Sequence, residues 1–195
     1  MLKTWKTLLS VVLLAGILSC GGIRYSEVSP DARDFHPRRI AVLPTEATNF
    51  PEAKGDIDRL FAEILSERKW FDGVIGGEAV GRRMESDAGF RQVVTDYMAK
   101  LANVNFSDPA LSGKIGELTG AEGFLLVRID YWNYTTENDK KIGKVSLTVR
   151  LIEAKTGKIL WTAFHHRISD YLIIKPELPD IARDLIREMV GYMPH

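Results

Sequence analysis

Cysteine is almost absent from this chain: of 195 residues only Cys20 carries a thiol, and none follows it. Disulfides, thiolate metal sites and a cysteine nucleophile are therefore excluded from everything after residue 20. The chain also lacks an excess of positive charge, with 26 basic residues against 26 acidic ones. Nucleic acids are bound through a clear basic surplus, so this balance argues against nucleic-acid binding.

Sequence motifs for enzyme chemistry are missing as well. The glycines of residues 73–81 match neither the dinucleotide fingerprint nor the Walker pattern, and no lysine stands at the required place. His165 and His166 are neighbours on a predicted strand, whose successive side chains point to opposite faces, so they cannot chelate one metal. No G-x-S-x-G elbow is present for a serine hydrolase. The sequence therefore predicts no catalytic residue, no metal site and no cofactor.

The first positive signal is the amino-terminal stretch. Lys3 and Lys6 precede an apolar run over residues 8–18, which is well short of the roughly 20 residues of a membrane-spanning helix. A charged start, a short apolar middle and small residues before a cleavage point are typical of a secretory signal peptide. We therefore expect residues 1–19 to be a signal peptide. Nothing later in the sequence is long and apolar enough for a membrane helix.

Cys20 stands at the expected cleavage point, after Ile17-Leu18-Ser19 and before Gly21-Gly22. This arrangement resembles the lipobox of bacterial lipoproteins. The resemblance implies cleavage before Cys20, a thioether-linked diacylglycerol on its sulfur, and an acyl chain such as palmitate on the new amino terminus. Because Gly21 and not aspartate follows the cysteine, it also implies an outer-membrane protein that faces the periplasm. A plain signal peptide, with a cysteine that happens to lie near the cut, is the alternative.

The rest of the chain divides into a tether and a domain. Removal of residues 1–19 would remove two lysines and leave 24 basic residues against 26 acidic ones. Residues 21–37 mix glycine, serine, proline and charge without periodicity, which predicts a short tether after the lipidated cysteine, over residues 20–37. Fully extended, this tether spans at most about 60 Å. We expect residues 38–195 to form a single folded domain that works close to the membrane.

Hydrophobic periodicity predicts nine elements in this domain. Five segments have the patterns of strands: 39–44, 70–75, 124–131, 145–151 and 159–167. Four segments repeat apolar residues at helical spacing: 57–65, 90–104, 109–118 and 181–190. Polar turns are predicted at 135–141 and 154–158. The order β-α-β-α-α-β-β-β-α predicts an α/β fold (α+β-like) in which helices pack on a mixed sheet.

Several segments resemble one group of proteins: residues 40–44, the pair Trp70-Phe71 before a strand, and residues 118–125 and 151–161. The group is the periplasmic α/β domain shared by the curli secretion channel lipoprotein, the penicillin-binding-protein activator lipoproteins and related envelope lipoproteins. The resemblance covers about residues 38–191, although Thr45 stands where an aromatic residue is usual. It implies a periplasmic α/β domain, and it carries no catalytic residue with it.

The same resemblance implies two kinds of role. A curli-type channel needs inserted membrane-spanning hairpins, whereas the hairpins predicted here belong to the core sheet. Penicillin-binding-protein activators reach through the cell wall on a long tether, and the tether here is short. We therefore expect a non-enzymatic, membrane-anchored lipoprotein that acts by protein contact in envelope assembly or secretion. A ring-forming, homo-oligomeric secretion component and a periplasmic enzyme of unknown type are the alternatives.

Two apolar stretches are candidates for the contact surface. Tyr131, Trp132 and Tyr134 lie at the end of a predicted strand, where neighbouring side chains alternate and cannot all face the core. Tyr171 and Leu172 begin an apolar stretch, residues 171–174, outside any predicted element. Tyr and Trp are enriched at protein interfaces, so we predict that these residues contact a partner protein. Packing against the sheet edge or beneath the final helix is the alternative.

Overall fold

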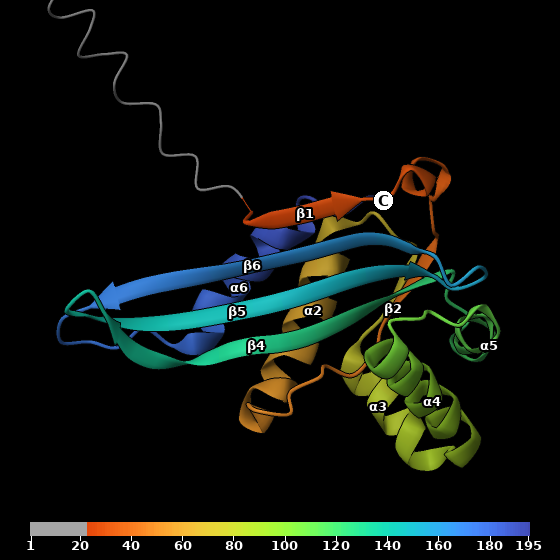
Figure 1. The fold of residues 1–195 in the computed structure, drawn as a ribbon, viewed down its shortest axis with the longest axis horizontal. Coiled ribbons are helices and arrows are strands. Elements are labelled where there is room, and N and C mark those ends of the chain that lie inside the picture. Colours follow the sequence, from red (N-terminus) through yellow and green to blue (C-terminus); the bar gives the residue numbers. More distant parts are fainter. Residues whose placement is uncertain (1–22) are drawn as a thin grey trace, which may run out of the picture.

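The structure is a computed structural model that describes residues 23–195. Cys20 and the predicted signal peptide, residues 1–19, lie outside the described residues. One six-stranded sheet forms the centre, in the order β1-β6-β5-β4-β2-β3 (Figure 1). Strand β2 runs parallel to both β3 and β4, whereas β4, β5 and β6 form an antiparallel meander. The predicted mixed sheet with helices packed on it is confirmed.

The elements have the following bounds. The strands are β1 (Tyr25–Val28), β2 (Arg39–Val42), β3 (Gly73–Ile75), β4 (Gly123–Glu137), β5 (Lys140–Glu153) and β6 (Ile159–Tyr171). The helices are α2 (Lys54–Arg68), α3 (Gly77–Ser86), α4 (Ala88–Val104), α5 (Pro109–Thr119) and α6 (Leu178–Val190), with the 3-10 turns η1 (Pro30–Asp34) and η2 (Pro51–Ala53). All nine predicted elements are present, and the structure adds β1 and α3.

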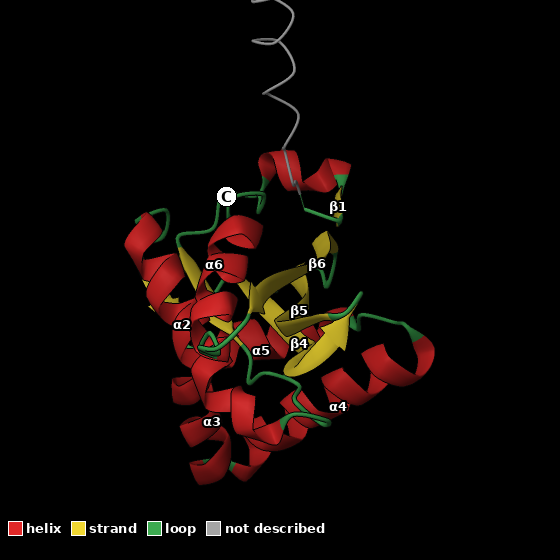
Figure 2. Cartoon of the chain, turned by 90° about the vertical axis from the view of Figure 1, so that its left-hand side faces the viewer, coloured by secondary structure: helices red, strands yellow, loops and turns green. Residues whose placement is uncertain are grey.

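Helices cover both faces of the sheet where β2 joins the meander. Helices α2 and α6 pack on one face, and α3, α4 and α5 lie on the other (Figure 2). The residues of β2 are apolar in an unbroken run because both faces of this strand are buried. Ile40 and Val42 enter the core beneath α2 and α6, while Ala41 and Leu43 enter the core beneath α3, α4 and α5. We call these two clusters the α2–α6 core and the α3–α5 core.

The meander extends well beyond helices α3, α4 and α5 (Figure 1). Its strands are 15, 14 and 13 residues long, so the outer part of each strand has no helix on that side. The other face stays covered, because Trp132, Val145 and Ile181 belong to the α2–α6 core. We call the uncovered side the open face. Asn138 and Asp139, both with positive φ, form the tight turn between β4 and β5, which is shorter than the predicted turn over 135–141.

Residues 25–34 differ from the predicted tether. Strand β1 pairs antiparallel with residues 161–164 of β6, and the indole Nε1 of Trp161 donates a hydrogen bond to Ser26 Oγ at 2.9 Å. Turn η1 follows, and it brings Ala32 and Phe35 into the α2–α6 core. The pattern failed to predict β1 because all four of its side chains are exposed, so the strand has no apolar alternation. Its pairing depends on the backbone.

The loop after β2 is organised by a buried carboxylate. Asp58 of α2 is buried, and its Oδ1 accepts hydrogen bonds from the Thr45 backbone N–H at 2.8 Å and from Thr45 Oγ1 at 2.6 Å. Lys54 Nζ lies 2.7 Å from Asp58 Oδ2. Helix α3 begins beside this carboxylate at Gly77, where a Cβ atom would come within 2.5 Å of Asp58 Oδ1. The unusual Thr45 thus serves a specific local structure.

Candidate functional site

The structure places the five predicted contact residues in three environments. Trp132 is 6% exposed and belongs to the α2–α6 core, so its side chain lies inside the domain. Tyr131 is half-buried against Phe50, with ring centroids 5.9 Å apart. The remaining three residues, Tyr134, Tyr171 and Leu172, come together at the outer end of the meander.

A β-bulge in β4 explains this separation. The register shifts between Ile129 and Tyr131, so that Asp130 has no opposite residue in β5. The carboxylate of Asp130 accepts hydrogen bonds from Arg128 Nε at 2.8 Å and from Thr148 Oγ1 at 2.6 Å. Because the bulge adds one residue, the alternation of side chains is displaced beyond it. Trp132 therefore faces the core, where simple alternation from Ile129 would have turned it outward.

We call the outer end of the meander the tip surface, and define it by Tyr134, Lys141 and residues 171–175. The rings of Tyr134 and Tyr171 meet edge to face, with centroids 5.9 Å apart. Tyr134 Oη donates to the Pro176 carbonyl at 2.7 Å, and Lys175 Nζ lies 4.6 Å from the centre of the Tyr134 ring. These contacts fasten the loop after β6 to strand β4.

The loop itself carries three aliphatic side chains that nothing in residues 23–195 covers. Leu172 and Ile173 are each 92% exposed, and Ile174 is 84% exposed. Beside them lies a shallow hollow of about 410 Å³, lined by Lys141, Lys175 and the two tyrosines among others. Desolvation raises the pKa of the Tyr134 hydroxyl above its usual value, so this group stays a hydrogen-bond donor at neutral pH. The tip surface is apolar and basic, and it has no catalytic constellation.

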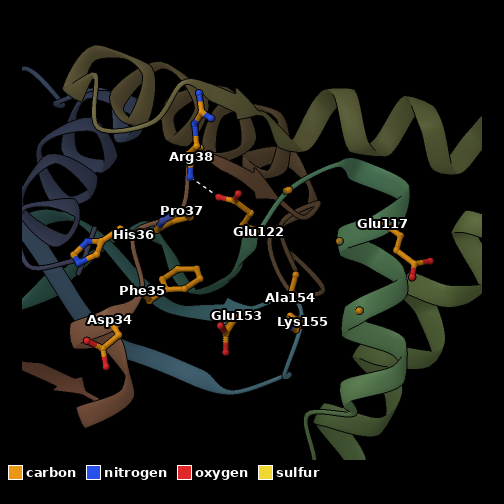
Figure 3. A pocket seen from close by; sticks show the side chains of 13 residues that line it. Asp34, Phe35, His36, Pro37, Arg38, Glu117, Glu122, Glu153, Ala154 and Lys155 are labelled. Atoms are coloured by element: carbon orange, nitrogen blue, oxygen red, sulfur yellow. Dashed lines mark hydrogen bonds between the residues drawn. The ribbon is translucent and has the colours of Figure 1, made fainter.

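A cavity of about 660 Å³ lies at the other end of the meander, beside the turn between β5 and β6 (Figure 3). Its walls are the segment from Asp34 to Arg38, helix α5, and residues 153–155. The ring of Phe35 forms part of the floor. Strand β4 begins there with Gly123, where a Cβ atom would come within 2.7 Å of Phe35 Cζ. A glycine is required at this position because the ring packs directly on the backbone.

The charged groups of this cavity are mostly engaged with neighbours. The Glu122 carboxylate accepts a hydrogen bond from the backbone N–H of Arg38, and Glu153 accepts one from the Thr156 hydroxyl. The lining contains no hydroxyl side chain that a base could activate. Within residues 23–195, no three histidine, aspartate or glutamate side chains are placed to hold a metal ion.

No sequence pattern predicts this cavity. Its lining comes from residues 34–38, 113–122 and 153–155, which are far apart in the sequence and share no motif. Only the folded structure brings them together. The tip surface was predicted in part, because Tyr171 and Leu172 begin an apolar stretch outside any element. Nothing in the sequence signalled that Tyr134 would reach Pro176 across 42 residues.

Comparison with known protein families and with curated proteins gives no match. Solved structures do match in fold. The PelC dodecamer from Paraburkholderia phytofirmans superposes with a TM-score of 0.57 and 18% identity, over 87% of this chain and 95% of that one. Lipoprotein GNA1162 from Neisseria meningitidis gives a TM-score of 0.51 and 16% identity, over 80% of this chain and 99% of that one.

At these identities the matches establish a shared fold. They support the predicted likeness to envelope lipoproteins at the level of architecture, since one of the two proteins is itself a lipoprotein. The finer resemblance, to the curli channel and to the penicillin-binding-protein activators, stays a prediction. Among residues 23–195, no helix has the length and apolar character needed to cross a membrane.

Proposed function

We propose that this protein is a lipid-anchored envelope lipoprotein without enzymatic activity, which acts by protein contact as one subunit of a head-to-tail assembly of its own copies. The observation that carries the proposal is a pair of open edges on opposite sides of one sheet. Strand β1 provides one edge, and the outer part of β4 provides the other.

The first open edge is the outer side of β1. Strand β1 pairs with β6 on one side only, because it lies at the edge of the sheet. All four of its residues are exposed. An edge strand of this kind presents unpaired backbone N–H and C=O groups, which another strand can pair with.

The second open edge is the outer part of β4. Strand β2 pairs with β4 only at residues 123–125, and a single bridge joins Glu46 to Arg128. From Tyr131 to Glu137, β4 pairs with β5 alone, and no other strand of residues 23–195 adjoins it. Two different edges cannot pair through a two-fold axis. A contact between them is heterologous, and it generates a ring if the rotation closes or a filament if it does not.

Three further observations support the proposal. The structurally similar PelC is a dodecamer, and the structurally similar GNA1162 is a lipoprotein. The lipobox-like sequence at Cys20 would supply the membrane anchor, because several acyl chains on one terminus bind a membrane stably. In the cavity beside the β5–β6 turn, Glu122 and Glu153 are engaged by the backbone N–H of Arg38 and by the Thr156 hydroxyl. We therefore propose that the two open edges act by contact with other copies of this chain.

A cysteine cross-linking experiment tests the assembly. We would introduce Glu27→Cys in β1 and Thr136→Cys in β4 into the full chain, together and singly, and oxidise the protein in native membranes. The two positions lie on opposite edges with two strands between them, so they are separated by more than about 14 Å, too far for an internal disulfide. The intact mass of the protein would report the lipid on Cys20, which also blocks the native thiol.

The expected result is a ladder of cross-linked species in the double variant and none in either single variant. Dimers with Glu27→Cys alone would indicate a two-fold contact between β1 strands and would contradict the head-to-tail arrangement. Monomers throughout, together with a monomeric mass in mild detergent, would overturn the assembly. A ladder that ends at one closed species would favour the ring-forming secretion component over an open chain.

A further inference from the structure

We infer that the loop Leu172–Ile174 inserts into the interfacial region of a lipid bilayer, as a second membrane contact beside the lipid on Cys20. The inference rests on the anchoring part of the proposed function, but it concerns a different part of the molecule. It assigns the aliphatic residues of the tip surface to lipid.

The first argument is the degree of exposure. Single exposed aliphatic residues are common on protein surfaces, but Leu172, Ile173 and Ile174 are consecutive and each is at least 84% exposed. They project from a loop that is held at its base by the contacts of Tyr134 with Tyr171 and Pro176. Contiguous exposed apolar surface of this kind marks a site of interaction with a protein or a membrane.

The second argument is the chemistry of the flanking residues. Tyrosines and lysines are the residues that lie at the level of lipid headgroups, where an apolar body meets a wet polar end. Tyr134, Tyr171, Lys141 and Lys175 line the hollow directly beside the aliphatic loop. Neither lysine forms an ion pair within residues 23–195. The hollow has no acidic side chain, so the basic groups are free to meet phosphate.

Some of the acidic residues near this region are compensated, whereas Asp139 of the β4–β5 turn and Glu177 have no ion pair within residues 23–195. Asp170 lies 3.9 Å from Lys140, and Glu137 lies 2.7 Å from Lys144. These pairs reduce the repulsion that an anionic headgroup would otherwise meet at the tip. The electrostatic contribution is therefore small, and the insertion depends mainly on the three aliphatic side chains.

The third argument is the place where the chain enters the fold. Strand β1 is antiparallel to β6, so its first residue, Tyr25, lies toward the tip surface and pairs with Phe164 (Figure 1). Tyr171 is seven residues further along β6, a distance of about 23 Å. Cys20 precedes Tyr25 by five residues, which can span at most about 18 Å. A lipid on Cys20 can therefore enter the membrane close to the level of the tip.

This geometry favours lipid over a second protein as the occupant. The lipid on Cys20 confines the domain near the bilayer, because β1 leaves only a very short connection. The connection leaves the end of β1 that points toward the aliphatic loop, beside the middle of β6. A bilayer is thus the apolar phase that the tip meets first.

The test uses the intact, lipidated protein in vesicles of phosphatidylethanolamine and phosphatidylglycerol. With Cys20 blocked by its thioether, Ile173→Cys provides a single thiol for an environment-sensitive fluorophore. Lys155→Cys, an exposed position in the turn at the opposite end of the meander, is the matched control. We would compare emission with and without lipids that carry a nitroxide on the acyl chain.

We expect the label at position 173 to shift to shorter wavelength and to be quenched by the nitroxide lipid, and the label at position 155 to show neither change. Equal responses at the two positions would overturn the inference. A blue shift at 173 without quenching would also overturn it, because a second copy or another protein would then cover the loop. The intact mass reports the lipid on Cys20 independently of the tip. It therefore distinguishes a failure of the lipid anchor from a failure of the loop to insert.

Discussion

The inner and outer parts of the β4–β5–β6 meander are made by the same three strands but have different surroundings. In the inner part, Phe124 and Leu125 are adjacent, and both are fully buried, one in each core. In the outer part only one face is covered, and the open face carries polar side chains such as Lys144 and Asn133. At the tip the aliphatic residues face solvent.

This difference separates stability from contact within a single sheet. Burial on two faces leaves no surface for a partner, and every large side chain there contributes to the free energy of unfolding. Coverage of one face leaves the outer strands ordered, and it frees their edges and the tip for other molecules. The following substitutions compare the two parts directly.

The largest effect is expected for Trp132→Ala, at the point where the outer part begins. Loss of a large aromatic side chain from the α2–α6 core should lower the free energy of unfolding by about 3–5 kcal/mol. Tyr131→Ala is the control, because the Tyr131 ring is only half-buried and faces the opposite side of the strand, so its loss should cost much less. Denaturant unfolding of both variants measures the difference. Similar losses would show that the bulge does not separate core from surface.

The next comparison uses one chemical change at two positions. Leu151→Ala removes a fully buried side chain from the inner part and should cost about 2–5 kcal/mol of unfolding free energy. Leu172→Ala removes a side chain that is 92% exposed, and it should change stability by no more than about 0.5 kcal/mol. Thermal and denaturant unfolding report both. A destabilising Leu172→Ala would mean that the tip loop contributes to the fold.

A smaller effect is expected for Asp58→Ala, which removes the carboxylate that holds the loop after β2. The Thr45 N–H and hydroxyl would lose their acceptor, at a cost of about 1–3 kcal/mol. Asp56→Ala is the control: Asp56 pairs with Arg59 on the helix surface, where such pairs contribute about 0–1 kcal/mol. If the two variants unfold at the same denaturant concentration, the buried network contributes little.

The smallest effect is a pH dependence from His166 on the open face. Burial, and then the positive charges of Arg24 and Lys144, hold the pKa of its imidazole below the usual 6.5. The unfolded chain therefore binds this proton more readily, and stability should fall as the pH drops below about 6.5. The loss should stay under about 1 kcal/mol, because the ring is only partly buried. His166→Gln should remove this component from the pH profile, and an unchanged profile would exclude His166 as its source.

The sequence predicts the inner part of the molecule better than its margins. Strand β2 and helices α2 and α6 bury apolar residues at regular spacing, so periodicity alone identifies them. Strand β1 buries no side chain, and its pairing through backbone groups leaves no trace in the pattern. Helix α3 was missed because Gly76 and Gly77 indicate the end of a strand, whereas Gly77 is needed there to clear Asp58.

The candidate site shows the same limit. Tyr171 and Leu172 could be predicted as a contact because an apolar stretch outside an element is visible in the sequence. Trp132 could not be assigned correctly, since its orientation depends on the bulge at Asp130, which no local pattern indicates. The hydrogen bond from Tyr134 to the Pro176 carbonyl, which holds the loop after β6, joins residues that are far apart in the sequence. Such contacts follow from the arrangement of the strands and not from the residues beside them.

The bulge at Asp130 also sets how changes in chain length would act on β4. Removing Asp130 alone would make Ile129, Tyr131 and Trp132 consecutive partners of Leu147, Ser146 and Val145, so Trp132 would stay in the core and only the carboxylate held by Arg128 and Thr148 would be lost. Adding two residues near the turn at Asn138 and Asp139 would lengthen the hairpin without exchanging its faces. Related chains are thus expected to vary in the length of this hairpin by even numbers of residues.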